Sequence, residues 1–375
     1  MAKILIITNL YPEDAEIPSL TEKSATRVSW AIHYLAQGLD QYGITITKVL
    51  RPQYEVNWRA LQFSKQKFRT EIIEGIKVET RSFFNVAKLG VIVRKSDREY
   101  IRSSIEGIDL IVSHMPDDTK LAAEIHKKFG IPFIAVLHEY DILNLARQKK
   151  LLPFAKNVYA RSWSIKRRAE AQGIPIDGIV YSGIEEKWIV GKQSFTKNSK
   201  IHFITVAALV KSKNIDIVLR ALSQLSHKMT WEYTIVGDGE EFENLQRLIV
   251  TLGLEKNVKM LGKKSREECL KEMRNADVFL MPSAPETFGL VYIEAMASGC
   301  IVICAKGAGV DGMIIDGGNG YVVEPGLVNA LQNTIENLYC KPQDEIVHNS
   351  LKTIKKYTIT KAQKNYAEII KKNIV

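Results

Sequence analysis

Residues 276–323 read ADVFLMPSAPETFGLVYIEAMASGCIVICAKGAGVDGMIIDGGNGYVV. The apolar run at residues 278–281 predicts a buried strand, and residues 290–298 predict a helix that ends before Gly299. A second apolar run, residues 301–304, predicts the next strand. Strand, loop, helix and strand in this order form a parallel βαβ unit, so this stretch predicts an α/β fold.

The same alternation of short apolar runs and helical patterns extends over the whole chain of 375 residues. Candidate strands lie at residues 4–7, 44–49, 110–112, 133–137 and 158–160 in the first half, and at 201–206, 233–236, 258–260, 278–281 and 301–304 in the second. A chain of this length exceeds what one hydrophobic core usually supports. The sequence therefore predicts two doubly wound α/β domains that face each other across a cleft, with ligands at the carboxyl ends of their strands.

A polar, aperiodic segment separates the two series of strands. It reads GKQSFTKNSK, residues 191–200, and predicts the interdomain linker. We expect an N-terminal domain over residues 1–190 and a C-terminal domain over 200–357. The last residues, about 358–375, form a basic amphipathic pattern with no strand after it, and we expect this helix to return to the first domain.

The composition is that of an ordinary globular protein, with 46% hydrophobic and 25% charged residues. No apolar run approaches the roughly 18 residues of a membrane span, and the N-terminal MAKILIITNLYPED predicts a first strand rather than a signal peptide. The four cysteines lack the paired spacing of a zinc site, so we expect no metal and a reducing cytoplasm. They are Cys269, Cys300, Cys304 and Cys340.

The basic charge is concentrated in the first half. Residues 1–200 hold 31 Lys and Arg against 22 Asp and Glu, whereas residues 201–375 hold 21 against 20. This excess predicts an anionic partner: phosphate, nucleic acid or a membrane surface. Basic clusters such as Arg94-Lys95 alternate with aromatic residues such as Tyr100, which suits the edge of a lipid bilayer better than a nucleic-acid groove.

The loop before the predicted helix at residues 290–298 carries groups that can contact the phosphate and hydroxyl groups of a ligand. Gly289 allows a ligand to approach the helix N-terminus, where free N–H groups and the helix dipole favour phosphate. Glu286 on the loop and Glu294 in the helix can accept hydrogen bonds from sugar or ribose hydroxyls.

Other polar residues have simpler structural interpretations. Asp117 and Asp118 could form a metal or acid–base pair, but a helix N-cap explains them better. Asp238 between two glycines is typical of a turn. We assign no function to His114 or Cys300.

The run PETFGLVYIEAMASG, residues 285–299, resembles the signature of the family 4 retaining glycosyltransferases, whose GT-B fold has two Rossmann-like domains. Further similar segments follow in the family's order. They are residues 136–139 (VLHE), 182–184 (SGI), 235–239 (IVGDG), 258–262 with Glu267-Glu268, 309–312 (GVDG) and 319–320. The similarity covers nearly the whole chain and is strongest over residues 201–323.

The resemblance implies how the donor is bound in the second domain. Glu294 would bind the ribose hydroxyls of the donor nucleotide. Glu286, with the N–H groups of Phe288, Gly289 and Leu290, would hold the transferred sugar and the diphosphate.

The resemblance also implies a metal-independent reaction. Lys213 would neutralise the diphosphate as the nucleotide departs, and His138 would reach across the cleft to the donor sugar. Gly237, Gly262 and Lys211 complete the implied donor site. No cofactor is implied beyond a UDP- or GDP-linked sugar as co-substrate, because lysine and a helix terminus supply the charge that a metal ion supplies elsewhere.

The chain departs from the family pattern at two places. Ala208 stands where the family usually has an arginine that contacts the diphosphate, and Lys211 could compensate for it as a point charge. The loop at residues 9–24 has Pro18-Ser19 where the family usually has a glycine pair, so the acceptor loop must differ.

We therefore expect a retaining, hexosyltransferase-like enzyme whose first domain binds the acceptor. The acceptor would be a saccharide or a lipid-diphosphate-linked saccharide of bacterial surface polysaccharide synthesis. The basic first domain also suggests a cytoplasmic protein at the inner face of the cell membrane. Alternatives are a degenerate partner subunit that binds nucleotide sugar without efficient turnover, a nucleotide-sugar epimerase, and a nucleic-acid-directed protein, although we expect no nucleic acid.

Overall fold

The structure is a computed structural model that describes residues 1–12, 30–55, 68–86, 90–92, 95–143, 145–190, 200–225, 228–340 and 343–374. The chain forms two compact units. The first comprises Met1–Arg161, Ile165–Tyr181 and Thr360–Val375, and the second comprises Ser162–Ser164 and Ser182–Ile359. The predicted linker, residues 191–200, lies outside the described residues except for Lys200.

The first unit is built on a sheet with the strand order β3-β4-β2-β1-β6-β7-β8-β9, and β5 pairs with β4. Neighbouring strands are parallel except for β3 and β5, which both run antiparallel to β4. The strands are β1 (Ala2–Ile7), β2 (Ile44–Glu55), β3 (Phe68–Ile73), β4 (Ile76–Val86), β5 (Gly90–Ile92), β6 (Leu110–His114), β7 (Phe133–Leu137), β8 (Asn157–Ala160) and β9 (Gly178–Ile179).

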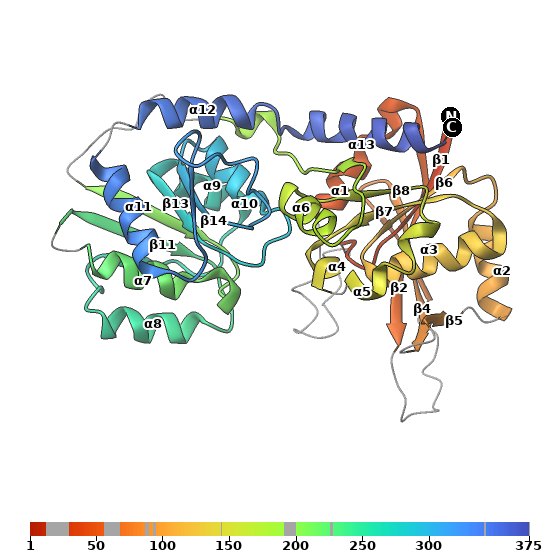
Figure 1. The fold of residues 1–375 in the computed structure, drawn as a ribbon, viewed down its shortest axis with the longest axis horizontal. Coiled ribbons are helices and arrows are strands. Elements are labelled where there is room, and N and C mark those ends of the chain that lie inside the picture. The colour runs from red at the N-terminus through yellow and green to blue at the C-terminus, as the bar shows by residue number, and fades with distance from the viewer. Residues whose placement is uncertain are drawn as a thin grey trace. The chain divides into compact units, whose positions relative to one another are not determined.

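Helices cover both faces of this sheet (Figure 1). In β1, Leu5 and Ile7 belong to a core that includes side chains of α2 and α3. Ile4 and Ile6 alternate with them and belong to a second core, with α1 and α13. The helices of this unit are α1 (Trp30–Gln37), α2 (Lys95–Ser104), α3 (Pro116–Phe129), α4 (Glu139–Leu143), α5 (Leu145–Gln148), most of α6 (Trp163–Glu170) and α13 (Ile359–Ile374).

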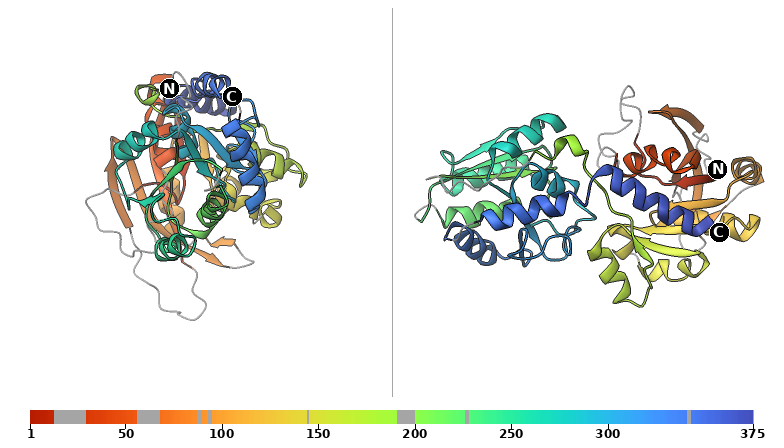
Figure 2. Two further views of the ribbon diagram at one scale, coloured as in Figure 1. Left: turned by 90° about the vertical axis from the view of Figure 1, so that its left-hand side faces the viewer. Right: turned by 90° about the horizontal axis from the view of Figure 1, so that it is seen from above.

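The C-terminal helix α13 belongs to the first unit from Thr360 onward. It lies beside α1, where Gln363 Nε2 donates to the carbonyl oxygen of Tyr34 at 2.7 Å. Both ends of the chain therefore belong to this unit (Figures 1 and 2).

The second unit has a fully parallel sheet with the strand order β12-β11-β10-β13-β14-β15. The strands are β10 (Ile201–Val206), β11 (Trp231–Val236), β12 (Val258–Met260), β13 (Val278–Met281), β14 (Ile301–Ala305) and β15 (Tyr321–Val323). The helices are α7 (Ile215–Ser223), α8 (Phe242–Thr251), α9 (Arg266–Asn275), α10 (Leu290–Ala297), α11 (Val328–Cys340) and α12 (Asp344–Ile354).

Two parallel-sheet units of α/β class confirm the fold predicted from the sequence. The main difference is at one edge of the first sheet, where β3, β4 and β5 were not predicted. None of the helices in the described residues is long and apolar enough to cross a membrane.

Candidate functional site

The loop between β13 and α10 begins the candidate site. Gly289 precedes α10 in a left-handed conformation with a φ of 75°, and a Cβ atom there would lie 2.4 Å from the ring of Tyr292. That ring is fixed, because the Tyr292 hydroxyl donates to the carbonyl oxygen of Met281 at 2.6 Å. Glycine is therefore required both by the backbone and by the available space.

The N-terminus of α10 has free hydrogen-bond donors. No side chain caps this helix, and within the described residues the N–H groups of Phe288, Gly289 and Leu290 have no protein acceptor. Unpaired N–H groups at a helix start, together with the helix dipole, attract phosphate. The three residues that the resemblance implied therefore present donors at one place.

Lys213 and Glu286 are brought together from two separate loops. Lys213 Nζ lies 2.6 Å from Glu286 Oε2, and their side chains are 19% and 15% exposed. Two further bonds join the loops: the Ala284 N–H donates to the Ser212 carbonyl at 3.1 Å, and Asn214 Nδ2 donates to the Pro282 carbonyl at 2.7 Å. These two hydrogen bonds hold together the loops that carry the charged pair.

Glu294 lies on α10 and pairs with a residue that the sequence did not indicate. Arg266, the first residue of α9, donates from Nε to Glu294 Oε1 at 2.9 Å. The Glu294 side chain is 14% exposed. Its carboxylate is therefore ionically paired yet accessible to a ligand.

The two predicted glycines support the ends of neighbouring strands. The N–H of Gly237, after β11, donates to the carbonyl of Gly262, after β12, at 2.9 Å. A Cβ atom on Gly237 would lie 1.8 Å from the carbonyl oxygen of Ala207, so three loops meet at this point. Lys211, by contrast, lines a hollow of about 490 Å³ with Arg220 and Arg247 on the side of α7 and α8.

His138 belongs to the first unit and follows β7. Its backbone N–H donates to Asp141 Oδ2 at 2.7 Å, and its Nε2 lies 3.1 Å from Nδ1 of His114. Burial raises the pKa of Asp141 to about 8. The contact of His138 with a donor sugar stays a prediction of the resemblance.

Asp117 and Asp118 do not cap α3, contrary to our interpretation of the sequence. The helix begins at Pro116, so both aspartates lie in its first turn, and the preceding Met115 makes no side-chain cap. Asp118 is fully buried and accepts hydrogen bonds from the Asn9 N–H at 3.0 Å and the Tyr54 hydroxyl at 2.9 Å. Burial raises the pKa of Asp118 above its ordinary value. Through its two hydrogen bonds, the carboxyl group connects α3 with the residues after β1 and with β2.

Sequence reasoning missed Arg266, Asp141 and the partners of His138. Arg266 precedes Glu267-Glu268, and Asp141 follows the VLHE segment by two residues, so both positions were next to motifs. Their side-chain directions depend on tertiary packing. Within the described ranges, no group of three His, Cys, Asp or Glu side chains is placed to hold a metal ion.

Residues 186–360 match the family described as glycosyl transferases group 1. This match covers just under half of the chain. The architecture is the GT-B fold: over 99% of this chain and 100% of the other, it superimposes with a TM-score of 0.70 on the Anabaena protein HepE, solved in complex with UDP and glucose. The two sequences are 20% identical, so this similarity concerns the fold.

Two of the similar proteins have names that state an enzymatic activity. N-acetyl-alpha-D-glucosaminyl L-malate synthase of Bacillus anthracis is 29% identical over 66% of this chain and 68% of its own length. GDP-mannose-dependent alpha-(1-6)-phosphatidylinositol monomannoside mannosyltransferase of Mycolicibacterium smegmatis is 31% identical over 37% of this chain. The match spans only 39% of that relative's length, which is too little to assign the activity of the whole relative to this chain.

Proposed function

We propose that the chain is a retaining glycosyltransferase that moves a sugar from a UDP- or GDP-linked donor to a saccharide or lipid-linked saccharide, in the synthesis of a cell-surface glycan. The group 1 family match and the GT-B fold support the class of enzyme. The names of the similar proteins support a nucleotide-sugar donor, with UDP in one case and GDP-mannose in the other.

One observation carries the proposal: the pair of Lys213 and Glu286, 2.6 Å apart, beside the uncapped N-terminus of α10. A nucleotide diphosphate sugar has an anionic diphosphate next to a neutral, hydroxyl-rich ring. Lys213 and the N–H groups of α10 match the diphosphate, whereas the carboxylates of Glu286 and Glu294 match hydroxyl donors.

The proposed reaction at this site runs as follows. The bond between the anomeric carbon and the phosphate oxygen breaks, and its electron pair goes to the departing diphosphate. The acceptor hydroxyl attacks on the same face, forms the new glycosidic bond and gives its proton to a diphosphate oxygen. Lys213 and the helix terminus stabilise the charge that develops on the leaving group, without a metal ion.

Titration calorimetry with UDP and GDP on the wild type, Glu294→Ala and Glu243→Ala tests the donor site. We expect one nucleotide to bind and Glu294→Ala to weaken it by at least about tenfold, because charged hydrogen bonds to the ribose are lost. Glu243, an exposed glutamate on α8, is the matched control and should bind normally. Equal binding by all three proteins would refute this donor site.

We further propose that the chain associates peripherally with an anionic bilayer, where it meets a lipid-linked acceptor. The support comes from a hollow of about 360 Å³ between α2 and α3. It is lined by the basic side chains of Lys95, Arg98, Arg102 and Lys128, together with Glu99 and Phe129.

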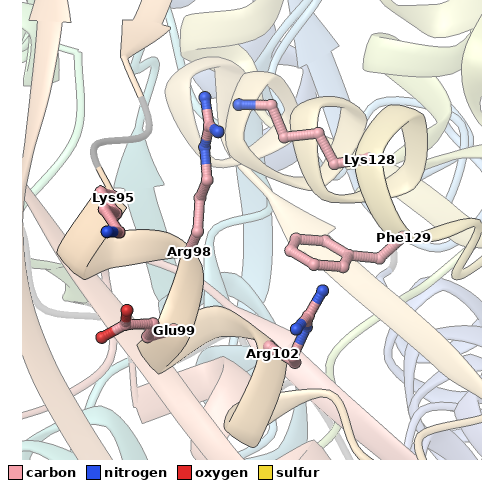
Figure 3. A pocket seen from close by; sticks show the side chains of 6 residues that line it. All are labelled: Lys95, Arg98, Glu99, Arg102, Lys128 and Phe129. Carbon is pink, nitrogen blue, oxygen red and sulfur yellow. The ribbon is translucent and has the colours of Figure 1, made fainter.

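Figure 3 shows these side chains, of which four are basic and one, Glu99, is acidic. Within the part of the chain that the structure describes, Arg98 and Arg102 form no ion pair, whereas Lys128 Nζ lies 3.8 Å from Glu124 Oε2. A hollow lined by four basic side chains and one acidic side chain favours the phosphate of a lipid headgroup.

Flotation with neutral and anionic vesicles tests the membrane proposal. Replacing Arg98 and Arg102 by glutamine should reduce binding to anionic vesicles on the order of tenfold at low salt, because each basic residue contributes about 1 kcal/mol near such a surface. The control replaces two exposed lysines of the second unit, Lys256 and Lys271, by glutamine. Equal loss in both double variants, or wild-type binding that ignores lipid charge, would contradict the proposal.

A further inference from the structure

Two histidines and a tyrosine form a buried network in the first unit. Nε2 of His138 lies 3.1 Å from Nδ1 of His114, and Nε2 of His114 lies 3.2 Å from the hydroxyl of Tyr366. His114 ends β6, His138 follows the neighbouring strand β7, and Tyr366 comes from α13 (Figure 1). His114 and Tyr366 are fully buried, and His138 is 5% exposed.

Both imidazole rings are neutral at physiological pH. Burial lowers the pKa of His114 to about 3, and burial together with the neighbouring His114 and Arg161 lowers the pKa of His138 well below its ordinary value. A neutral imidazole has one N–H and one unprotonated nitrogen. In a bond between two such rings, one nitrogen must donate and the other must accept, so the network can run in only two directions.

The hydroxyl of Tyr366 determines which nitrogen donates and which accepts in the hydrogen bonds of this network. Burial raises the pKa of Tyr366 above its ordinary value, so the side chain remains a phenol. Within the described residues, Nε2 of His114 is the only acceptor recorded for its hydroxyl. A buried hydroxyl rarely leaves its proton without a partner. Tyr366 therefore donates to Nε2 of His114, and Nδ1–H of His114 donates to Nε2 of His138.

We propose that Tyr366 and His114 are positioning residues that hold the proton of His138 on Nδ1. His138 then presents an N–H donor, rather than a lone pair, to a sugar hydroxyl. Its Nδ1 has no partner within the described residues, and its backbone is held by Asp141. This inference rests on the proposed function and on the role of His138 toward the donor sugar that the resemblance implies. It assigns a positioning role to Tyr366 of the C-terminal helix.

Nitrogen NMR of the full chain with labelled histidine side chains tests the tautomer without any activity measurement. In the wild type, the signals of His114 and His138 should both report a proton on Nδ1. In Tyr366→Phe, which keeps the ring but loses the hydroxyl, the signal of His138 should become that of a mixture. A wild-type His138 protonated on Nε2, or a signal unchanged in Tyr366→Phe, would overturn the proposal.

Tyr159→Phe is the matched control. Tyr159 is also buried, and its hydroxyl accepts a hydrogen bond from Asn373 of the same helix at 2.9 Å, but it is not bonded to either histidine. Its removal should disturb the packing of α13 to a similar extent and leave the histidine tautomers unchanged. If both variants altered the signal of His138, the effect would be structural and the proposal would fail.

Kinetics with the nucleotide sugar give the second measurement. Tyr366→Phe should lower kcat about tenfold with little change in KM, the size expected for one well-oriented hydrogen bond. Adding His114→Asn should restore both the tautomer and kcat, because the asparagine amide can donate in place of Nδ1–H without Tyr366. Persistent loss in the double variant would contradict the proposal, whereas the expected tautomers without any glycosyl transfer would instead refute the proposed function.

Discussion

The polar groups at the strand ends of the two units differ in their exposure to solvent. In the second unit, partly exposed ion pairs follow the strands, as in Lys213 with Glu286 and Arg266 with Glu294. In the first unit, His138 and other polar groups at the strand ends are buried. A ligand can compete for exposed charges, whereas buried neutral groups present a fixed set of donors and acceptors. We therefore propose that the second unit neutralises an anion and that the first positions uncharged hydroxyls.

Removing a charge from the second unit should have the largest effect. We expect Lys213→Ala to lower kcat by 10²- to 10³-fold, on the order expected when a group that stabilises developing charge is lost. The free energy of unfolding should change little, because Lys213 is partly exposed. Steady-state kinetics and urea denaturation measure the two quantities. Arg220→Ala, an exposed cation on α7, is the control, and an equal loss of kcat there would remove the special role of Lys213.

The two glycines beneath the candidate donor site both have a positive φ, which is 142° at Gly237, so they should show what a close contact adds to backbone strain. A Cβ atom on Gly237 would lie 1.8 Å from the Ala207 carbonyl oxygen, whereas one on Gly262 would have no atom within 4 Å, although its φ is 68°. We expect Gly237→Ala to lower the free energy of unfolding by about 3 kcal/mol or more, and Gly262→Ala by about 1 kcal/mol. Urea denaturation compares the two, and equal losses would contradict the packing argument.

These glycines also show what the sequence could predict. Both stand in motifs, and the βα alternation around them predicted the parallel sheet of the second unit correctly. The β3–β5 edge was missed because segments such as FRTEII mix charged and apolar residues without a clear period. His114 received no role because its partner, Tyr366, is 252 residues away in sequence. The pairing of Lys213 with Glu286 likewise required two loops to meet, and local patterns cannot report such contacts.

The buried carboxyl groups of the first unit should appear in the pH dependence of stability. Burial raises the pKa of Asp141 to about 8, so the folded protein keeps this proton between about pH 4 and pH 8, whereas the unfolded chain releases it. The contribution of Asp141 is complete below about pH 4 and is lost as the pH rises to 8.

Asp141→Asn should remove that loss, because asparagine resembles the protonated acid. We expect the wild type to lose on the order of 2 kcal/mol more than Asp141→Asn between pH 5 and pH 8, measured by urea denaturation. Asp40→Asn, at an exposed carboxylate, should follow the wild type. Parallel pH profiles for all three proteins would show that the first unit does not hold a neutral carboxyl group here.

The smallest effect should come from replacing Arg266. Arg266 bonds Glu294 at 2.9 Å and is 34% exposed, so solvent screens the pair and its contribution should be at most about 1 kcal/mol. We expect Arg266→Gln to weaken nucleotide binding about threefold, because Glu294 loses the donor that orients it. Arg247→Gln, at an exposed arginine of α8, should leave the affinity unchanged in the same calorimetric titration. Tighter binding by Arg266→Gln would mean that the arginine competes with the ribose hydroxyls for the Glu294 carboxylate. The ion pair would then oppose nucleotide binding instead of orienting Glu294 for it.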